Sequence, residues 1–108
     1  MKNTIKLNRE FAYAYKKGTK IVTDTLVLYC YANRQSQSKL GLTVSTALGG
    51  AVVRNRLKRL MRAAFGARKD DVKNGYNIIL AARNRMKDAK FEKICGDLDY
   101  CFKKAGLI

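Results

Sequence analysis

The segment from Arg54 to Arg62 places five cations in nine residues beside a continuous apolar stripe, and it constrains the fold more than any other part of the chain. At about 100° per residue, the apolar positions fall on one face of a helix. These positions are Val53, Leu57, Leu60, Met61 and Ala64. The other side carries Asn55, Lys58, Arg59 and Arg62, with Arg54 and Arg56 at its flanks. One face of this helix can therefore pack on a core while the other presents a dense row of cations.

These cations are not balanced by neighbouring acids, because no Asp or Glu occurs between Thr25 and Lys69. Most charge runs are simply solvated helix faces. An uninterrupted row of arginines is different, because each guanidinium binds phosphate through a rigid planar fork. The segment therefore favours a face that binds a nucleic-acid backbone.

The composition of the whole chain points the same way. It has 23 Lys and Arg against 8 Asp and Glu, a net charge of +15 on 108 residues. A chain with this charge repels itself unless an anionic partner relieves the repulsion. Its length and apolar content predict one folded domain, residues 1–108. No stretch approaches the roughly 18 to 20 apolar residues that span a bilayer, and no signal-peptide pattern is present. We therefore expect a cytoplasmic protein with no membrane contact.

Catalysis by the side chains of this chain is not expected, because it contains no histidine. Cys–His catalysis, Ser–His triads and the common histidine-bearing metal sites are thereby excluded. Cys30, Cys95 and Cys101 lack the CxxC spacing of zinc sites, and we expect all three to be reduced core side chains. The prediction is no catalytic residue, no metal ligand and no small-molecule substrate.

Hydrophobic periodicity and turn residues predict the order of the elements. A helix begins at Asn8 as its N-cap and ends at Gly18. Strands follow over residues 21–31, bent near Thr23-Asp24, and over residues 39–45. The basic helix runs from Gly49-Gly50 to about residue 68. After a turn at residues 74–75, residues 76–82 form an almost wholly apolar strand, hence a central one. A last helix starts near residue 88 and closes at residue 106. This order predicts an α+β fold with a single four-stranded mixed sheet covered by helices, α-β-β-β-α-β-α.

A second functional feature is aromatic. Along the first strand, Val27, Tyr29 and Tyr31 point to one face, since side chains alternate. With Phe11 and Tyr15 of the first helix, these rings can stack unpaired bases or can fill the core between helix and sheet. The spacing leaves both readings open. It also leaves open whether Gly41 marks a close approach or a bulge in its strand.

Several strings of the chain match a known family. They are Leu40-Gly41-Leu42-Thr43-Val44-Ser45, the run from Gly49 to Phe65 that contains Arg54-Asn55-Arg56-Leu57-Lys58-Arg59-Leu60, and upstream Leu7-Asn8-Arg9-Glu10-Phe11 with Tyr15 and Gly18. Residues 76–83 match as well. Over nearly its whole length, the chain resembles the bacterial ribonuclease P protein component.

The resemblance implies that the chain is the protein subunit of ribonuclease P. It would bind ribonuclease P RNA and the single-stranded 5′ leader of precursor tRNA, and so promote endonucleolytic removal of the leader. The RNA subunit would carry the active site and most of the bound Mg²⁺, and the protein would do no bond chemistry. The resemblance also implies a left-handed β-α-β crossover through the basic helix, against the usual right-handed rule.

The same resemblance implies two groups of site residues. The residues that would face the catalytic RNA are Arg54, Asn55, Arg56 and Arg59. A leader-binding cleft between the first helix, the sheet face and the basic helix would comprise Phe11, Tyr15, Val27, Tyr29, Lys58 and Arg62. The chain departs from the family pattern at Thr46 and Ala47, where many members carry lysine.

Two other classes of protein share the charge and size of this chain. One is a ribosomal or general cytoplasmic RNA-binding protein, and the other is a nucleoid-type DNA-binding module. The aromatic residues beside the basic helix discriminate against the DNA-binding module, because a duplex binder has little use for exposed tyrosines.

Overall fold

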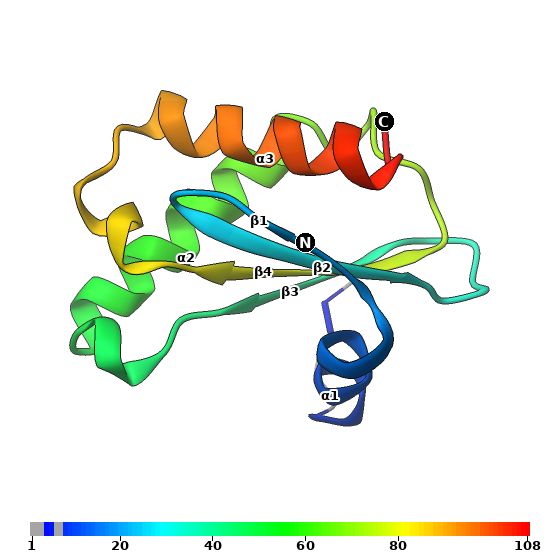
Figure 1. Ribbon diagram of the computed structural model, residues 1–108, viewed down its shortest axis with the longest axis horizontal. Helices are drawn as coiled ribbons and strands as arrows, with labels where there is room; N and C mark the ends of the chain where they lie inside the picture. Colours follow the sequence, from blue (N-terminus) through cyan, green and yellow to red (C-terminus); the bar gives the residue numbers. More distant parts are fainter. Residues whose placement is uncertain (1–3, 6–7) are drawn as a thin grey trace.

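The computed structural model describes residues 4–5 and 8–108 and shows an α+β fold built on one four-stranded sheet (Figure 1). In chain order the elements, with η for a 3-10 helix, are α1 (Asn8–Lys17), β1 (Thr19–Val22), β2 (Leu26–Ala32), β3 (Lys39–Thr43), η1 (Thr46–Leu48), α2 (Ala51–Gly66), β4 (Tyr76–Ala82), η2 (Asn84–Asp88) and α3 (Phe91–Ala105). The predicted α+β class and the predicted order α-β-β-β-α-β-α are confirmed, although β1 and β2 together occupy the region expected as one bent strand.

The sheet is mixed, with the strand order β1-β2-β4-β3. β2 runs antiparallel to both β1 and β4, whereas β3 runs parallel to β4. Because α2 lies between β3 and β4 in the chain, it is the crossover that joins two parallel neighbours. β4 has a strand on each side, which explains its apolar sequence: Ile78, Ile79 and Leu80 are fully buried.

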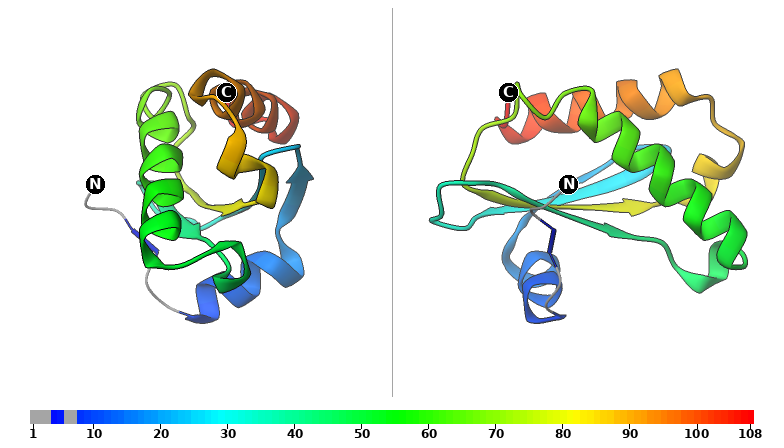
Figure 2. Two further views of the ribbon diagram at one scale, coloured as in Figure 1. Left: turned by 90° about the vertical axis from the view of Figure 1, so that its left-hand side faces the viewer. Right: turned by 180° about the vertical axis from the view of Figure 1, so that it is seen from behind.

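Helices cover both faces of the sheet (Figure 2). α1 lies against one face, and α2 and α3 pack together against the other. The predicted alternation along β2 is confirmed: Leu26, Leu28 and Cys30 join the main core beneath α2 and α3, while Tyr29 and Tyr31 pack on the α1 side. Both tyrosines therefore share a face with α1. Among the described residues, no helix is long and apolar enough to cross a bilayer.

Residues 21–31 form a hairpin instead of the predicted single bent strand. The chain reverses after Val22, so that β1 pairs antiparallel with β2. Thr23 stabilises the reversal, because its Oγ1 donates a hydrogen bond to the Leu26 carbonyl at 2.7 Å. The buried Thr25 completes it by donating from both its backbone N–H and its hydroxyl to Asp97 of α3.

Other boundaries shift by a few residues. The last helix begins at Phe91, because Asp88 closes the short helix η2. β3 ends at Thr43, since the Ser45 hydroxyl caps η1 by accepting a hydrogen bond from the Ala47 N–H. α2 ends at Gly66 and a turn follows it.

Two glycines allow close approaches that fix α1 on the sheet. A Cβ at Gly18 would lie 2.6 Å from the Ala14 carbonyl oxygen and 2.9 Å from the Cys30 carbonyl oxygen. A Cβ at Gly41 would lie 3.0 Å from the Phe11 ring. The pairing of β3 with β4 is continuous through Gly41, so this glycine marks a close approach and no bulge.

The three cysteines are unpaired thiols, as predicted. Cys30 and Cys101 are buried, and Cys95 is half-buried against the main core. Burial raises the pKa of the Cys101 thiol to about 12, which keeps it protonated at neutral pH.

Candidate nucleic-acid interface

The predicted apolar stripe of α2 is confirmed. Leu57, Met61 and Ala64 are buried in the main core, and Val53 and Leu60 pack partly buried against it. Phe65 extends the stripe by one turn, where its ring meets Phe102 of α3 at 5.9 Å between centroids. This anchoring fixes which side of α2 faces solvent.

The four residues expected to face the catalytic RNA occupy the solvent side of α2 from one flank to the other. Arg54 and Arg56 lie about 200° apart around the helix axis. Arg54 Nε donates to the Gly49 carbonyl at 3.1 Å, and Arg56 Nη2 donates to the Lys87 carbonyl at 3.1 Å. Asn55 and Arg59 are exposed between them. Each flanking guanidinium is thus oriented by one backbone bond and keeps further N–H donors for a ligand.

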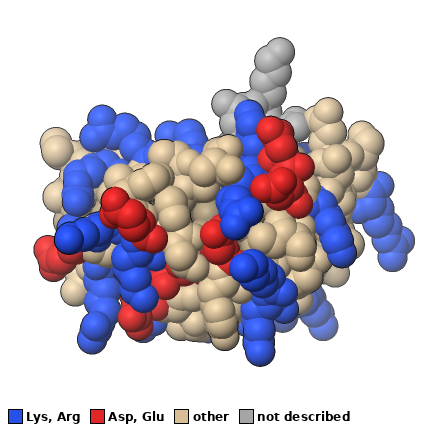
Figure 3. All heavy atoms as spheres, turned by 90° about the horizontal axis from the view of Figure 1, so that it is seen from above, with Lys and Arg blue, Asp and Glu red and all other residues tan. Residues whose placement is uncertain are grey.

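The charge of this surface is uncompensated. α2 contains no acidic residue, and within the described part of the chain the only cations in ion pairs are Lys39, Arg68 and Lys93. Figure 3 views the molecule from the α3 side, where acidic groups lie among the cations. There Arg68 pairs with Asp99 at 2.9 Å and Lys93 pairs with Asp97 at 3.1 Å. Asp97 and Asp99 of α3 are therefore paired with Lys93 and Arg68, and none of the ion pairs among the described residues involves a cation of α2.

Three of the predicted cleft residues form an aromatic cluster on the α1 face of the sheet. Phe11 and Tyr15 lie 6.4 Å apart between ring centroids, and Tyr15 meets Tyr29 edge to face at 4.8 Å. The side chain of Tyr15 also forms a hydrogen bond with Thr43 of β3. Partial burial raises the pKa of Tyr15, with the Thr43 bond acting in the opposite direction, so the ring stays neutral at physiological pH.

The cluster borders an open strip of the sheet. Across the strands, Val22, Val27, Ala81 and Thr43 are successive partners, and the side chain of Val22 is 51% exposed. Tyr15 itself is 47% exposed. The rings therefore pack on one another between α1 and the sheet, and Tyr15 still presents surface to solvent.

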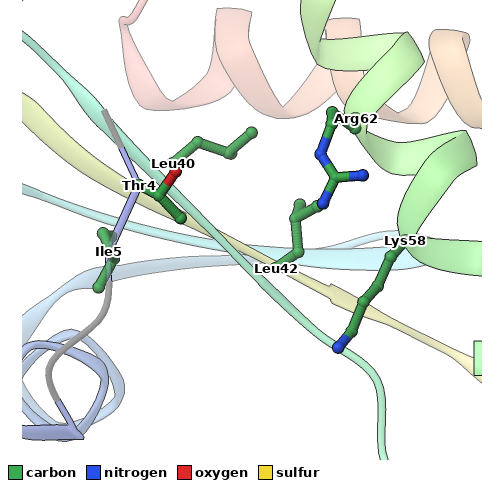
Figure 4. Close-up of a pocket in the computed structure, with 6 residues that line it drawn as sticks. All are labelled: Thr4, Ile5, Leu40, Leu42, Lys58 and Arg62. Atoms are coloured by element: carbon green, nitrogen blue, oxygen red, sulfur yellow. The ribbon is translucent and has the colours of Figure 1, made fainter. Parts of the chain in front are cut away.

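Lys58 and Arg62 lie on the other side of β3 from this cluster. They line a pocket of about 240 Å³ together with Leu40, Leu42, Thr4 and Ile5 (Figure 4). Leu40 and Leu42 point toward α2, whereas Gly41 and Thr43 meet Phe11 and Tyr15. The structure thus separates the six predicted cleft residues into two groups, one on each side of the edge strand β3.

Two contributors to the site were missed from the sequence. The ammonium group of Lys20 lies 5.9 Å from the centroid of the Tyr29 ring, and Thr43 bonds Tyr15. Lys20 is the direct partner of Tyr29 in the β1–β2 register. Lys20 and Tyr29 face each other only because β1 and β2 form a hairpin, and the expected single bent strand contains no such cross-strand pair.

The described residues hold no group of three or more His, Cys, Asp or Glu side chains placed to bind a metal ion. No reaction step is therefore assigned to a metal held by this chain.

The comparisons with known proteins agree along the whole chain. The sequence model of the family described as Ribonuclease P matches residues 1–106. The ribonuclease P protein component of Clostridium kluyveri is 40% identical over 105 residues, covering 95% of this chain and 94% of that protein. The homologue from Shouchella clausii is 38% identical, covering 96% and 86%.

Solved structures show the same fold. The Staphylococcus aureus RNase P protein superposes with a TM-score of 0.87 at 33% identity, covering 99% of this chain and 98% of that one. The Thermotoga maritima RNase P protein gives a TM-score of 0.84 at 26% identity, covering 94% and 96%. The mixed sheet and the helices that cover it are therefore the fold of a recognised family. The chain belongs to the ribonuclease P protein family.

Proposed function

We propose that this chain is the protein subunit of a bacterial ribonuclease P and acts in 5′ maturation of tRNA. The observation that carries the proposal is the pairing, on this family fold, of an uncompensated cationic helix face with a partly exposed aromatic cluster. The first is suited to a structured RNA backbone and the second to unpaired bases.

The solvent side of α2 is the proposed contact with ribonuclease P RNA, through Arg54, Asn55, Arg56 and Arg59. Two of these guanidinium groups are already held by backbone carbonyls of Gly49 and Lys87, so they lose less side-chain freedom on binding. A planar guanidinium binds phosphate through two parallel N–H bonds, which favours arginine over lysine at such positions.

The 5′ leader of precursor tRNA is the proposed ligand of the strip beside Tyr15, Tyr29 and Val27, with Phe11 behind it. A leader is single-stranded, so its bases are free to stack on these rings. Lys58 and Arg62 would bind leader phosphates only where the RNA leader crosses the outer edge of β3, because these two residues lie on the far side of β3 from the aromatic cluster.

The protein would act by positioning the substrate and by lowering the repulsion between two polyanions. Mg²⁺ would be bound mainly by the RNA subunit, which would carry the bond chemistry. Less magnesium should then be needed for cleavage when the protein is present, since its cations replace part of the neutralising charge.

The test is cleavage of a 5′-labelled precursor tRNA at low magnesium, with bacterial ribonuclease P RNA alone and with this protein added. Strong stimulation with a product cut at the mature 5′ end is the expected result. Tight RNA binding without stimulation would contradict the proposal and would assign the chain to general RNA binding.

A further inference from the structure

A second pocket lies on the side of α1 opposite Tyr15, next to the loop that joins β2 to β3. Its volume is about 300 Å³. Residues from α1, β2, the loop and β4 line it, and those that matter here are Arg9, Glu10, Tyr13, Tyr31, Arg34 and Asn77. None of these six belongs to the surfaces described above.

An aromatic pair forms one wall of this pocket. Tyr13 and Tyr31 meet edge to face with 4.7 Å between ring centroids, almost the geometry of Tyr15 and Tyr29. Tyr13 is 52% exposed, so the contact with Tyr31 holds its ring without covering it. A ring held in this way offers a flat apolar surface at little cost in conformational freedom.

A hydrogen-bond network fixes the floor of the pocket to the central strand. Asn77 of β4 is only 2% exposed. Its Nδ2 donates to the Tyr31 hydroxyl oxygen at 2.7 Å and to Glu10 Oε2 at 3.1 Å, and its Oδ1 accepts from Asn33 Nδ2 at 2.8 Å. The Glu10 carboxylate lies 3.5 Å from Lys39 Nζ, which offsets its repulsion of an anion.

Two arginines border the pocket with their charges uncompensated. Neither Arg9 nor Arg34 takes part in an ion pair within residues 4–5 and 8–108, and both are exposed. Arg34 has a φ of 60°, in the left-handed region that few residues other than glycine adopt. Asn33 holds the loop in this conformation, because its Oδ1 accepts from the Gln35 N–H at 2.8 Å and its Nδ2 donates to the Gln37 carbonyl at 3.1 Å.

We propose that this pocket binds an unpaired nucleotide of RNA, with the base stacked on Tyr13 and the phosphate bound by Arg9 and Arg34. The proposal rests on the proposed function as an RNA-binding subunit. The pocket is a site separate from the strip beside Tyr15, because Tyr13 and Tyr15 lie about 200° apart on a helix roughly 10 Å wide. The ligand is single-stranded, since a paired base does not offer its face to a tyrosine.

The experiment uses the holoenzyme assembled from this protein and ribonuclease P RNA. The first readout is the affinity of the protein for that RNA, and the second is the ratio of holoenzyme affinities for precursor and mature tRNA. Tyr13→Ala should weaken one of the two at least about five-fold, whereas Tyr13→Phe keeps the ring and should match the parent. Tyr100→Ala removes an equally exposed ring from α3 and is the matched control.

Arg34→Asn tests the phosphate contact without disturbing the aromatic packing. Asparagine tolerates the left-handed conformation, so the loop should be retained. Loss of one phosphate contact should reduce the slope of log affinity against log salt by about 1. This variant keeps the proposal testable if Tyr13→Ala unfolds, which circular dichroism would reveal.

The two readouts also distinguish the source of the nucleotide. Weaker binding to ribonuclease P RNA by Tyr13→Ala assigns it to the catalytic RNA, and a lower precursor-to-mature ratio assigns it to the leader. Equal behaviour of Tyr13→Ala, Arg34→Asn and the parent in both readouts overturns the proposal, as does an equal loss in Tyr13→Phe or Tyr100→Ala. Failure of the parent protein to stimulate cleavage is a separate result, which contradicts the proposed function itself.

Discussion

At the scale of single residues, the leader-binding proposal depends most on Tyr15. Its ring touches Phe11 and Tyr29 and remains half exposed. Stacking of one base on an aromatic side chain contributes about 1–3 kcal/mol. Tyr15→Ala should therefore lower the ratio of precursor to mature tRNA affinity by about five-fold or more. Equilibrium binding of both tRNAs to the holoenzyme measures this ratio, and a ratio equal to that of the parent protein would contradict the assignment.

A second residue-scale prediction concerns Gly18, where α1 meets the sheet. A Cβ at this position would contact two backbone carbonyl oxygens at 2.6 and 2.9 Å, and backbone does not yield as a side-chain tip does. Gly18→Ala should lower the free energy of unfolding by about 1–3 kcal/mol, as overpacking does. The matched control is Gly96→Ala on α3, where no atom lies within 4 Å of the added Cβ.

Urea unfolding measures both glycine variants. Gly96→Ala should stabilise the protein by up to about 1 kcal/mol, because alanine is the better helix former. Equal stabilities of the two variants would contradict the close approach of α1 to β2.

At the scale of elements, α2 carries the proposed contact with the catalytic RNA. Arg56 is exposed and makes one hydrogen bond to a backbone carbonyl, so Arg56→Ala should change the free energy of unfolding by less than about 1 kcal/mol. It should nevertheless weaken binding to ribonuclease P RNA. Lys104→Ala removes the same charge from the last turn of α3 and serves as the control. Filter binding in which both variants lose affinity equally would show that net charge alone matters.

α3 is attached to the β1–β2 turn through Asp97, which is 8% exposed. Burial alone would raise the pKa of this carboxyl, but hydrogen bonds from Thr25 and Lys93 outweigh it and lower the pKa below its ordinary value. A lowered pKa means that the charged form stabilises the fold above the unfolded-state value and that this stabilisation is lost as the pH falls through the folded-state value.

Asp97→Asn should therefore reduce the free energy of unfolding at neutral pH by about 1.5–3 kcal/mol, the contribution of hydrogen bonds to a charged group. The difference from the parent protein should shrink below about pH 4, where the parent carboxyl also becomes neutral. Urea titrations at neutral and acidic pH measure it. A difference that stays constant over this range would show that the Asp97 charge does not anchor α3.

Element boundaries show what the sequence could and could not predict. The strand over residues 76–82 was predicted with the observed bounds, because a central strand is apolar on both faces. The apolar stripe of α2 was predicted because the spacing of its apolar residues matches the period of an α-helix. The β1–β2 hairpin was not, because its reversal depends on Thr25 bonding to Asp97, 72 residues away in the chain. The division of the cleft residues by β3 was hidden for the same reason, since it follows from the order of strands in the sheet.

At the scale of the whole molecule, the charge is distributed unevenly. The net charge is +15, and in the described part of the chain the four ion pairs on the α3 side use Asp24, Asp71, Asp97 and Asp99, while none involves a residue of α2. If about six phosphates are neutralised, log affinity for ribonuclease P RNA should fall against log salt with a slope of about −4 to −5. Binding titrations over a range of salt at constant magnesium measure the slope. A slope near zero would contradict an electrostatic interface.

The first described residues of the chain have a consequence for solubility. The Ile5 N–H donates to the Leu40 carbonyl at 3.0 Å, and Thr4 forms a parallel bridge to Leu40. They occupy part of the outer edge of β3, where an open row of backbone donors and acceptors would otherwise be a template for a strand of another molecule. Thr4 and Ile5 thus shield part of the sheet's own edge against edge-to-edge aggregation.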